Sequence, residues 1–313
     1  MNIQQLEYII AVDNFRHFAK AAEVCCITQP TLSMMIQKME EELGAKIFDR
    51  SKHPVAPTAI GKLIIDQARI CLKYFKQIKD IVDNEQNTTK GTFKLGIIPT
   101  IAPYLVPAIL EKQNSKYKDI ELILKESTTN NLINDIQKGI LDGGLMAGPL
   151  DRPELLEYPL YYEKFYAYVS PLDERYAEKE IDLDDIDIND VWLLENEHCL
   201  RGQIERLCQM KRKASAENIF IKYESGSIDT LIHIVDYNHG ITIVPEMHAM
   251  GLSEDKQENL RAFKNMTAVR EVCLVVSKEY VRSAMLQIII EIIKSSVPKS
   301  MQNPELKNYV VNL

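Results

Sequence analysis

The stretch from residue 18 to residue 50 constrains the fold of this chain more than any other. Four residues at helical spacing share one face of a short helix: Phe18, Ala21, Ala22 and Cys25. Thr28 can cap a second helix, Pro30 fits its first turn, and Gly44 ends it. The apolar stripe of that second helix consists of Leu32, Ile36, Met39 and Leu43. The spacing therefore predicts two helices joined by a tight turn.

The outward face of the second helix is polar. Its members can all hydrogen-bond a phosphate or a base edge: Gln29, Thr31, Ser33, Gln37 and Lys38. A polar helix presented in this way has the geometry that enters the major groove of DNA. Spacing alone is equally compatible with a solvated helical hairpin, so a more specific pattern is needed.

The segment closely resembles the winged helix-turn-helix of LysR-type transcription regulators. That family's signature starts with an aromatic residue and Ala-Ala, continues with Ser/Thr-Gln-Pro-x-Leu-Ser, and ends with Leu-Glu-x-x-Leu-Gly and Leu-Phe-x-Arg. The matching residues are Phe18 with Ala21 and Ala22, residues 28–33 (TQPTLS), residues 39–44 (MEEELG) and residues 47–50 (IFDR). The resemblance implies that residues 1–58 bind double-stranded promoter DNA through Gln29, Pro30, Thr31, Ser33, Gln37, Lys38, Arg50 and Lys52.

The charge of the chain argues against nucleic acid. There are 37 Lys and Arg against 45 Asp and Glu, a net charge of −8, and residues 1–60 hold no excess of basic side chains. Phosphate contacts dominate DNA affinity, so charge alone favours another partner. Two features outweigh it: Glu40, Glu41 and Glu42 cluster at the far end of the second helix, and an oligomer multiplies weak contacts.

Length and hydropathy bound the class of protein. A chain of 313 residues suggests two or three domains. It contains no run of about 18 apolar residues, and its start is unlike a signal peptide. We therefore expect a cytoplasmic protein with no membrane partner, no cofactor and no bound metal. Its six cysteines should then be reduced thiols, with Cys25, Cys71 and Cys273 buried as small hydrophobes.

A long helix is predicted after the wing. Thr58 can cap it, and a polar hinge over residues 84–91 ends it. Its apolar residues alternate steps of four and three, as in a coiled-coil seam: Ile64, Ala68, Cys71, Phe75, Ile78 and Val82. We expect this helix, within residues 59–90, to pair two chains.

Beyond the hinge, short apolar strands alternate with helices. Strands are predicted over residues 93–98, 120–125, 166–170, 192–194, 219–223, 241–244 and 271–277. The alternation predicts a parallel sheet covered on both faces. Two α/β lobes around a cleft resemble the periplasmic-binding-protein-like effector domain of the LysR-type family. The expected organisation is a DNA-binding domain (1–58), a linker helix (59–90), a two-lobed regulatory domain (91–300) and a tail (301–313).

Cys199 and Cys208 differ from the other cysteines in their setting. Arg201, and His198 if protonated, favour a thiolate at Cys199, whereas the nearby glutamates oppose it. In a helix the two Cα atoms are about 13–14 Å apart on opposite faces, and a disulfide needs about 4.4–6.8 Å. Oxidation must then unwind the segment. Ring closure stabilises by only about 2.5–3 kcal/mol, which suits a reversible switch.

The residues alone leave other interpretations of this pair open. The first is two unrelated buried thiols. The second is a zinc site with His198, although the spacing of Cys199 and Cys208 fits no common zinc finger. The third is a thiol peroxidase, which would need neither a DNA-binding module nor a dimerising helix.

Further motifs resemble the peroxide-sensing members of the LysR-type family across nearly the whole chain. They are residues 66–69, 96–100, 103–105, 198–201 with Cys208, and 240–242. The resemblance implies that Cys199 is the peroxidatic thiol and Cys208 the resolving thiol. It also implies a peroxide pocket made of Thr100, Thr129, His198 and Arg270. Glu197 departs from the family, in which a glycine is usual at this position.

The sequence thus predicts a transcription factor, not an enzyme, that senses hydrogen peroxide through a reversible disulfide and activates oxidative-stress genes. The resemblance further implies a homotetramer built as a dimer of dimers, contact with RNA polymerase, and a cellular dithiol reductant. Two rivals are kept: a LysR-type regulator that responds to a small organic anion in the lobe cleft, and a thiol peroxidase-like enzyme.

Overall fold

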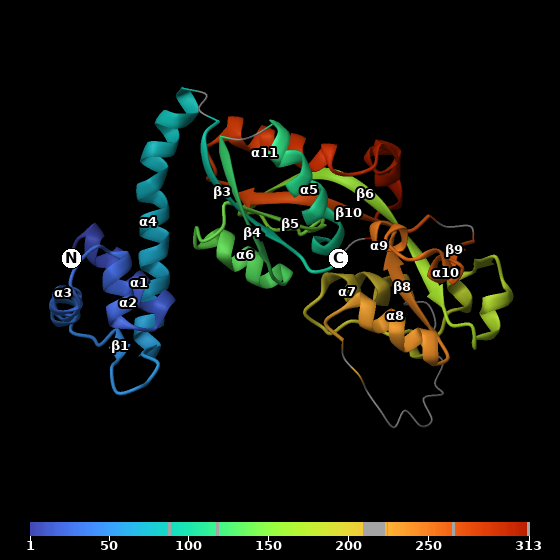
Figure 1. Cartoon of the computed structure of the whole chain (residues 1–313), viewed down its shortest axis with the longest axis horizontal. Coiled ribbons are helices and arrows are strands. Elements are labelled where there is room, and N and C mark those ends of the chain that lie inside the picture. The colour runs from blue at the N-terminus through green and yellow to red at the C-terminus, as the bar shows by residue number, and fades with distance from the viewer. Residues whose placement is uncertain (87–88, 117–118, 209–222, 224, 265–266, 312–313) are drawn as a thin grey trace. The chain divides into compact units, whose positions relative to one another are not determined.

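The structure is a computed structural model that describes residues 1–86, 89–116, 119–208, 223, 225–264 and 267–311 (Figure 1). The chain divides into two compact units. The first holds Met1–Thr88 with Gln137–Ile140, and the second holds Thr89–Ile136 with Leu141–Leu313. Among the described residues, no helix is long and apolar enough to cross a membrane.

The first unit contains the predicted helix-turn-helix. Its elements are α1 (Ile3–Phe15), α2 (Phe18–Val24), α3 (Gln29–Leu43), α4 (Ala59–Glu85) and an antiparallel wing of β1 (Phe48–Asp49) and β2 (Ala56–Pro57). The Thr28 and Thr58 hydroxyls accept hydrogen bonds from amides in the first turns of α3 and α4, so both predicted caps are confirmed. A Cβ at Gly61 would overlap the carbonyl oxygen of Ile47, so glycine lets α4 lie against the wing.

One predicted core position in α3 is wrong. Leu43 is 41% exposed, and Glu40 takes the buried position near the end of the helix. The Glu40 carboxylate accepts hydrogen bonds from the amides of Ile47 (2.8 Å) and Phe48 (3.2 Å). A buried carboxylate satisfied in this way joins α3 to the wing, so one of the three clustered glutamates serves the fold.

Helix α4 departs from the predicted seam in its first half. Ala68 is only 2% exposed and lies in the core of the first unit, because α1 packs against this face of α4. Ile64 is half buried against the same core. The later members of the predicted seam are exposed: Cys71, Phe75, Ile78 and Val82. The prediction that Cys71 is a buried hydrophobe is therefore wrong for the single chain.

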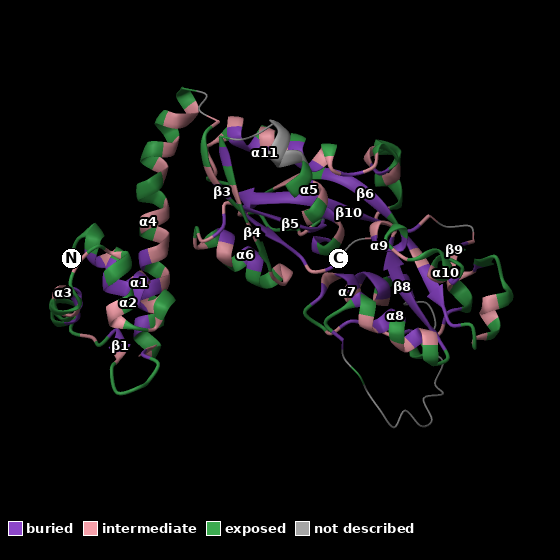
Figure 2. Ribbon diagram, in the orientation of Figure 1, coloured by how far each residue is buried: buried purple, intermediate pink, exposed green. Residues whose placement is uncertain are grey.

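The second unit has two lobes, each with its own hydrophobic core (Figure 1). Lobe 1 is built from β3 (Gly91–Ile97), α5 (Ala102–Lys116), β4 (Ile120–Glu126), α6 (Thr129–Gln137), β5 (Gly143–Gly148) and α11 (Ser283–Ser295). Lobe 2 is built from β7 (Glu180–Ile181), α7 (Cys199–Leu207), α8 (Ile228–Tyr237), β8 (Ile241–Pro245), α9 (Glu246–Met250), α10 (Glu254–Gln257) and β9 (Leu260–Phe263). The long strands β6 (Leu155–Val169) and β10 (Val269–Ser277) join the lobes, and β10 is buried along its whole length (Figure 2).

The sheet is mixed, not parallel throughout as predicted. Strand β3 pairs in parallel with β4 and β5, but β10 pairs antiparallel with both β5 and β6. The alternation of strands and helices does not reveal the antiparallel pairing, because β10 comes late in the chain but lies in the middle of the sheet. Residues 192–194 form no regular strand and contribute only an isolated bridge at Leu194. Most of the strand predicted over residues 219–223 lies outside the described residues.

The predicted tail contacts both lobes, since Met301 is buried in the core of lobe 1 and Val311 packs against the core of lobe 2. After two short turns of 3-10 helix, Lys299–Gln302 and Pro304–Tyr309, Val310 pairs with Val269 of β10. The Val311 amide donates to the Val269 carbonyl (2.8 Å), and Gln203 of α7 donates to the Val311 carbonyl (3.3 Å). Val311 therefore contacts the helix that carries Cys199.

Candidate functional site

Helix α7 places the two thiols at its ends. Cys199 is its first residue, His198 is its N-cap, and Cys208 is its C-cap. The sequence suggested a helix between the two cysteines only as a condition, and the structure contains one over Cys199–Leu207. Its length implies a separation of about 13–14 Å between the two cysteine Cα atoms. All six cysteines lie within the described residues and are free thiols.

The two ends of α7 have different surroundings. Cys199 is half buried and packs against the core of lobe 1, although α7 itself belongs to lobe 2. Cys208 is 3% exposed and is part of the core of lobe 2. Burial raises the pKa of the Cys208 thiol to about 11, so this thiol is protonated at neutral pH.

A pocket of about 310 Å³ lies beside Cys199. Thr129 and His198 line it together with Cys199, so the structure unites three of the predicted site residues. The Thr129 hydroxyl oxygen is buried and has no hydrogen-bond partner among the described residues. A buried polar atom in this state indicates a place for a water or another small polar molecule.

The contacts of Arg201 differ from the sequence prediction, in which this side chain favours a thiolate at Cys199. Arg201 donates to the Glu205 carboxylate (2.9 Å) and to the Leu194 carbonyl (2.9 Å), so its guanidinium stabilises the helix and has partners other than the thiol. His198 is buried, with Nε2 3.5 Å from a carboxylate oxygen of Glu195. Arg152 also lines the pocket and was not predicted. Its position in a loop after β5 was the available signal, since such loops carry ligand contacts in α/β folds.

Thr100 and Arg270 lie in a second, buried cluster. Arg270 donates to the hydroxyl (2.9 Å) and to the carbonyl (3.2 Å) of Thr100. Glu163, which was not predicted, forms an ion pair with Arg270. Thr100 follows β3 and Thr129 follows β4, and these are neighbouring parallel strands, so both threonines lie at the same edge of the sheet. The structure therefore brings the predicted pocket residues together in two groups.

The metal alternative fails on geometry. A zinc site would need Cys208 next to His198 and Cys199, but Cys208 is at the opposite end of α7. Among the described residues, no group of three or more His, Cys, Asp or Glu side chains is arranged to hold a metal ion. The interpretation as two unrelated buried thiols fits Cys208 but not Cys199, which lines a pocket.

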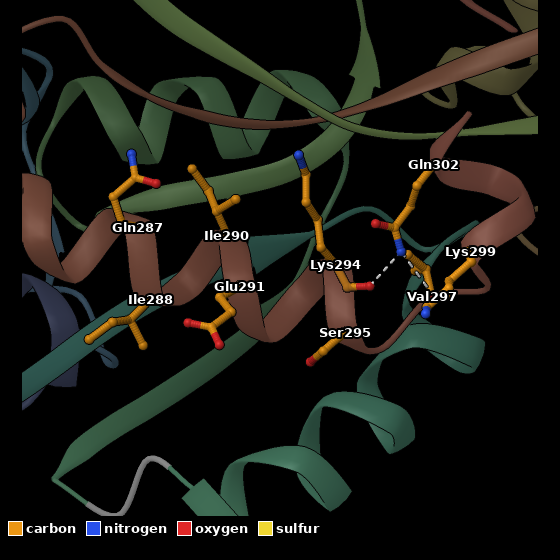
Figure 3. Close-up of a pocket in the computed structure, with 9 residues that line it drawn as sticks. All are labelled: Gln287, Ile288, Ile290, Glu291, Lys294, Ser295, Val297, Lys299 and Gln302. Atoms are coloured by element: carbon orange, nitrogen blue, oxygen red, sulfur yellow. Dashed lines mark hydrogen bonds between the residues drawn. The ribbon is translucent and has the colours of Figure 1, made fainter. Parts of the chain in front are cut away.

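A wider groove of about 660 Å³ runs along α11 in lobe 1 (Figure 3). Gln302 lies at one end of it and caps α11 by donating to the carbonyl of Lys294 (2.7 Å). The residues that line this groove include neither cysteine nor histidine. The groove therefore offers no redox chemistry, and none of the predicted site residues belongs to it.

The predicted DNA-contact residues lie on α3 and the wing. Those that are exposed are Gln29, Pro30, Gln37, Lys38, Arg50 and Lys52, whereas Thr31 and Ser33 are half buried. Arg50 donates to the Ser33 hydroxyl (2.9 Å), and its guanidinium carbon lies 5.0 Å from the centre of the Phe18 ring. Arg50 thereby connects the wing to the exposed face of α3.

Fold and site together define a class of protein. A winged helix-turn-helix with an exposed polar helix has the geometry of a DNA-binding domain. The separate two-lobed unit carries a small pocket with a thiol in its wall, which suits the detection of a signal. The combination defines a signal-responsive transcription regulator.

Comparison with known families identifies the group. Residues 3–62 match the bacterial regulatory helix-turn-helix proteins of the lysR family, and residues 86–298 match the LysR substrate binding domain. The chain therefore belongs to the LysR family of bacterial transcription regulators.

Individual relatives narrow this membership to the OxyR type. The chain is 33% identical over 247 residues to the hydrogen peroxide-inducible genes activator of Haemophilus influenzae, covering 79% of this chain and 81% of that one. It is 33% identical over 248 residues to the DNA-binding transcriptional dual regulator OxyR of Escherichia coli, with coverages of 79% and 80%. A full-length OxyR variant from Pseudomonas aeruginosa matches the structure with a TM-score of 0.76 at 28% identity, covering 94% and 98%. These relatives are regulators, not enzymes.

Proposed function

We propose that this regulator senses hydrogen peroxide through Cys199, and that a reversible Cys199–Cys208 disulfide alters its contacts with promoter DNA and activates oxidative-stress genes. The contrast between a pocket-lining Cys199 and a core-buried Cys208 on one short helix carries the proposal. A relative named hydrogen peroxide-inducible genes activator supports it.

The first step is attack by the Cys199 thiolate on peroxide. An S–O bond forms while the O–O bond breaks, and the second oxygen leaves as hydroxide and takes up a proton to become water. The sulfur is oxidised to a sulfenic acid, and the peroxide is reduced by the same two electrons. Thr129 and His198 are the candidate donors to the leaving oxygen within the pocket, and Thr100 with Arg270 lies at the same sheet edge.

The second step is attack by the Cys208 sulfur on the sulfenic acid, which forms the S–S bond and releases water. The separation of about 13–14 Å between the Cα atoms far exceeds the reach of a disulfide, so α7 must unwind. Unwinding also removes Cys208 from the surroundings that raise its pKa, which makes it a better nucleophile. A dithiol reductant of the cytoplasm restores both thiols by exchange.

The DNA-binding part of the proposal assigns Arg50, Lys38 and Lys52 to phosphates. It assigns the remaining exposed or half-exposed side chains of α3 to base edges or groove contacts: Gln29, Pro30, Thr31, Ser33 and Gln37. Arg50→Ala should then weaken binding to all sequences and flatten the salt dependence, whereas Gln29→Ala should change the preferred sequence. Equal losses on all sequences for both variants would remove the base-reading role of Gln29.

The exposed apolar side chains in the second half of α4 support assembly through that helix. Phe75, Ile78 and Val82 form a stripe that a second chain can cover. We propose a homotetramer that uses this stripe and contacts between regulatory domains, with RNA polymerase as a further partner. Phe75→Asp should abolish tight DNA binding while the second unit stays folded. Normal dimerisation and footprinting by this variant would exclude α4 from the interface.

A thiol map tests the central part of the proposal. The full-length reduced protein is treated with about one equivalent of hydrogen peroxide, and its cysteine pairs and promoter footprint are compared before and after. The expected result is one peroxide consumed per subunit, a Cys199–Cys208 pair and a changed footprint. A protein that ignores peroxide but responds to a small organic anion would support the rival regulator. Sustained peroxide turnover with an added dithiol and an unchanged footprint would support a peroxidase.

A further inference from the structure

We propose that Glu163 is a positioning residue for the peroxide reaction: it orients Arg270, and through Arg270 it fixes the Thr100 hydroxyl as a hydrogen-bond donor to peroxide at Cys199. This inference rests on the proposed function and adds to it a residue from the strands that join the lobes. Glu163 lies on β6 and Arg270 on β10, and the two are directly paired in the antiparallel register.

The ion pair fixes one edge of the Arg270 guanidinium. A single oxygen of Glu163, Oε1, accepts from Nε (2.9 Å) and lies 2.8 Å from the second terminal nitrogen of the guanidinium. The other oxygen, Oε2, accepts from the amide of Met247 in α9 (3.2 Å). The side chains of Glu163 and Arg270 are 0% and 1% exposed. A carboxylate held from two sides and shielded from water gives the guanidinium a single orientation.

That orientation determines the role of Thr100. The remaining terminal nitrogen of Arg270 donates to the Thr100 hydroxyl (2.9 Å). Arginine has only donors, so the Thr100 oxygen accepts in this bond and its own proton is left for another acceptor. A hydroxyl that accepts from a cation is also a stronger donor, because hydrogen bonds in a chain polarise one another. Thr100 does not line the pocket at Cys199, but it follows β3, and β3 pairs in parallel with β4, which precedes the pocket residue Thr129. From this shared sheet edge, the acceptor we assign is the peroxide oxygen that leaves when Cys199 attacks.

A purely structural role for Glu163 makes a different prediction. A buried arginine needs a counter-charge, and removing one partner of such a pair is destabilising whatever the function. If neutralisation were its only task, Glu163→Asp would preserve the reaction, since it keeps the charge. If Glu163 sets the position of Arg270, the shorter side chain shifts the guanidinium and the reaction with peroxide slows even in a folded protein.

The experiment compares two reagents on full-length reduced protein. For Glu163→Gln and Glu163→Asp, we expect the rate of Cys199 oxidation by hydrogen peroxide to fall about 10–100-fold, as for a lost transition-state donor. The rate of Cys199 alkylation by iodoacetamide should stay within about twofold of wild type, because alkylation needs no donor to a leaving oxygen. In a Thr100→Val background, Glu163→Asp should have no further effect on the peroxide rate.

Controls separate this role from instability and from failure of the proposed function. Met285→Ala empties a fully buried position of the lobe 1 core, so it should lower the melting temperature without changing the ratio of the two rates. Wild-type peroxide rates in folded Glu163→Asp would overturn the inference and leave the proposed function standing. Wild-type protein in which Cys199 reacts with peroxide no faster than an ordinary thiol would overturn the proposed function itself.

Discussion

The two ends of α7 have different surroundings: Cys199 is the first residue of the helix and Cys208 is its C-cap. At the first end, Cys199 is half buried, packs against the other lobe and lines a pocket with Thr129, whose hydroxyl has no hydrogen-bond partner in the described part of the chain. At the second end, Cys208 lies in a core, and burial raises its pKa. The first end can meet a small reagent without rearrangement, whereas the second can react only after the helix opens.

In the proposed mechanism, this difference separates the detection of peroxide from the conformational switch. Attack at Cys199 uses the structure as it stands, so its rate depends on the groups around the pocket. The proposed disulfide would form at a rate that depends on the stability of α7 and of its contacts, including the hydrogen bond from Gln203 to the Val311 carbonyl. Substitutions at the two ends should therefore change different steps.

The largest expected effect separates the two thiols. Cys199→Ser should slow peroxide consumption by about three orders of magnitude, because the nucleophile is gone. Cys208→Ser should keep the rate of attack but accumulate sulfenic acid at Cys199, because no thiol resolves it. Stopped-flow kinetics combined with trapping by a sulfenic acid reagent and mass spectrometry measures both. Equal loss of attack in the two variants would contradict the division of roles.

A second prediction uses the pKa of Cys208, which burial raises from 9.0 to about 11. Between these pH values the unfolded chain loses the Cys208 proton and the folded protein keeps it. The free energy of unfolding therefore falls as pH rises through this window, by up to about 3 kcal/mol. Urea unfolding of reduced protein at about pH 8 and about pH 10.5 should show a smaller decrease in Cys208→Ala than in wild type. Cys71→Ala, which alters an exposed thiol, is the control and should keep the wild-type decrease.

Much of the fold could be predicted from the sequence, because helix caps and helical spacing are local patterns. Caps at Thr28 and Thr58 and the helical spacing of α3 specify the fold of the first unit. The burial of Ala68 was missed because a heptad pattern does not reveal which face packs against its own domain. The antiparallel β10 was missed because its partners lie more than 100 residues earlier in the chain.

The candidate site could be predicted only in part, because some of its contacts join residues that lie far apart in the sequence. Cys199, His198 and Thr129 could be assigned through the resemblance, and they do line one pocket. Glu163 gave no signal, since a glutamate in a strand normally faces water and its partner Arg270 is 107 residues away. Arg201 was misjudged because nearness in sequence does not show that its guanidinium pairs with Glu205.

A third prediction concerns the pocket wall. Thr129→Val removes the unpartnered hydroxyl with little change in shape and should slow oxidation of Cys199 by peroxide about tenfold. A disulfide produced by a general thiol oxidant should form at the wild-type rate, since that chemistry needs no donor in the pocket. Thr128→Val changes the neighbouring threonine and serves as the matched control. Equal slowing by both variants would remove the specific role of Thr129.

The smallest expected effect belongs to Glu197, an exposed carboxylate at the pocket. Glu197→Gln removes a negative charge near the Cys199 thiolate and should accelerate oxidation about two- to threefold at low salt. The difference should disappear at about 1 M salt, because solvent ions screen exposed charges. Peroxide kinetics over a salt series gives the measurement. A salt-independent acceleration would point to loop flexibility as the cause.

Amide hydrogen exchange of α7 tests the central claim most directly. Full-length protein is compared before and after one equivalent of peroxide, with mass spectrometry of the peptide that spans residues 199–208. The account predicts that these amides exchange faster in the oxidised protein, that the amides of β3, β5 and β10 keep their protection, and that Cys208→Ser keeps a protected α7 after peroxide. Quantitative formation of the Cys199–Cys208 disulfide with α7 still fully protected would contradict it.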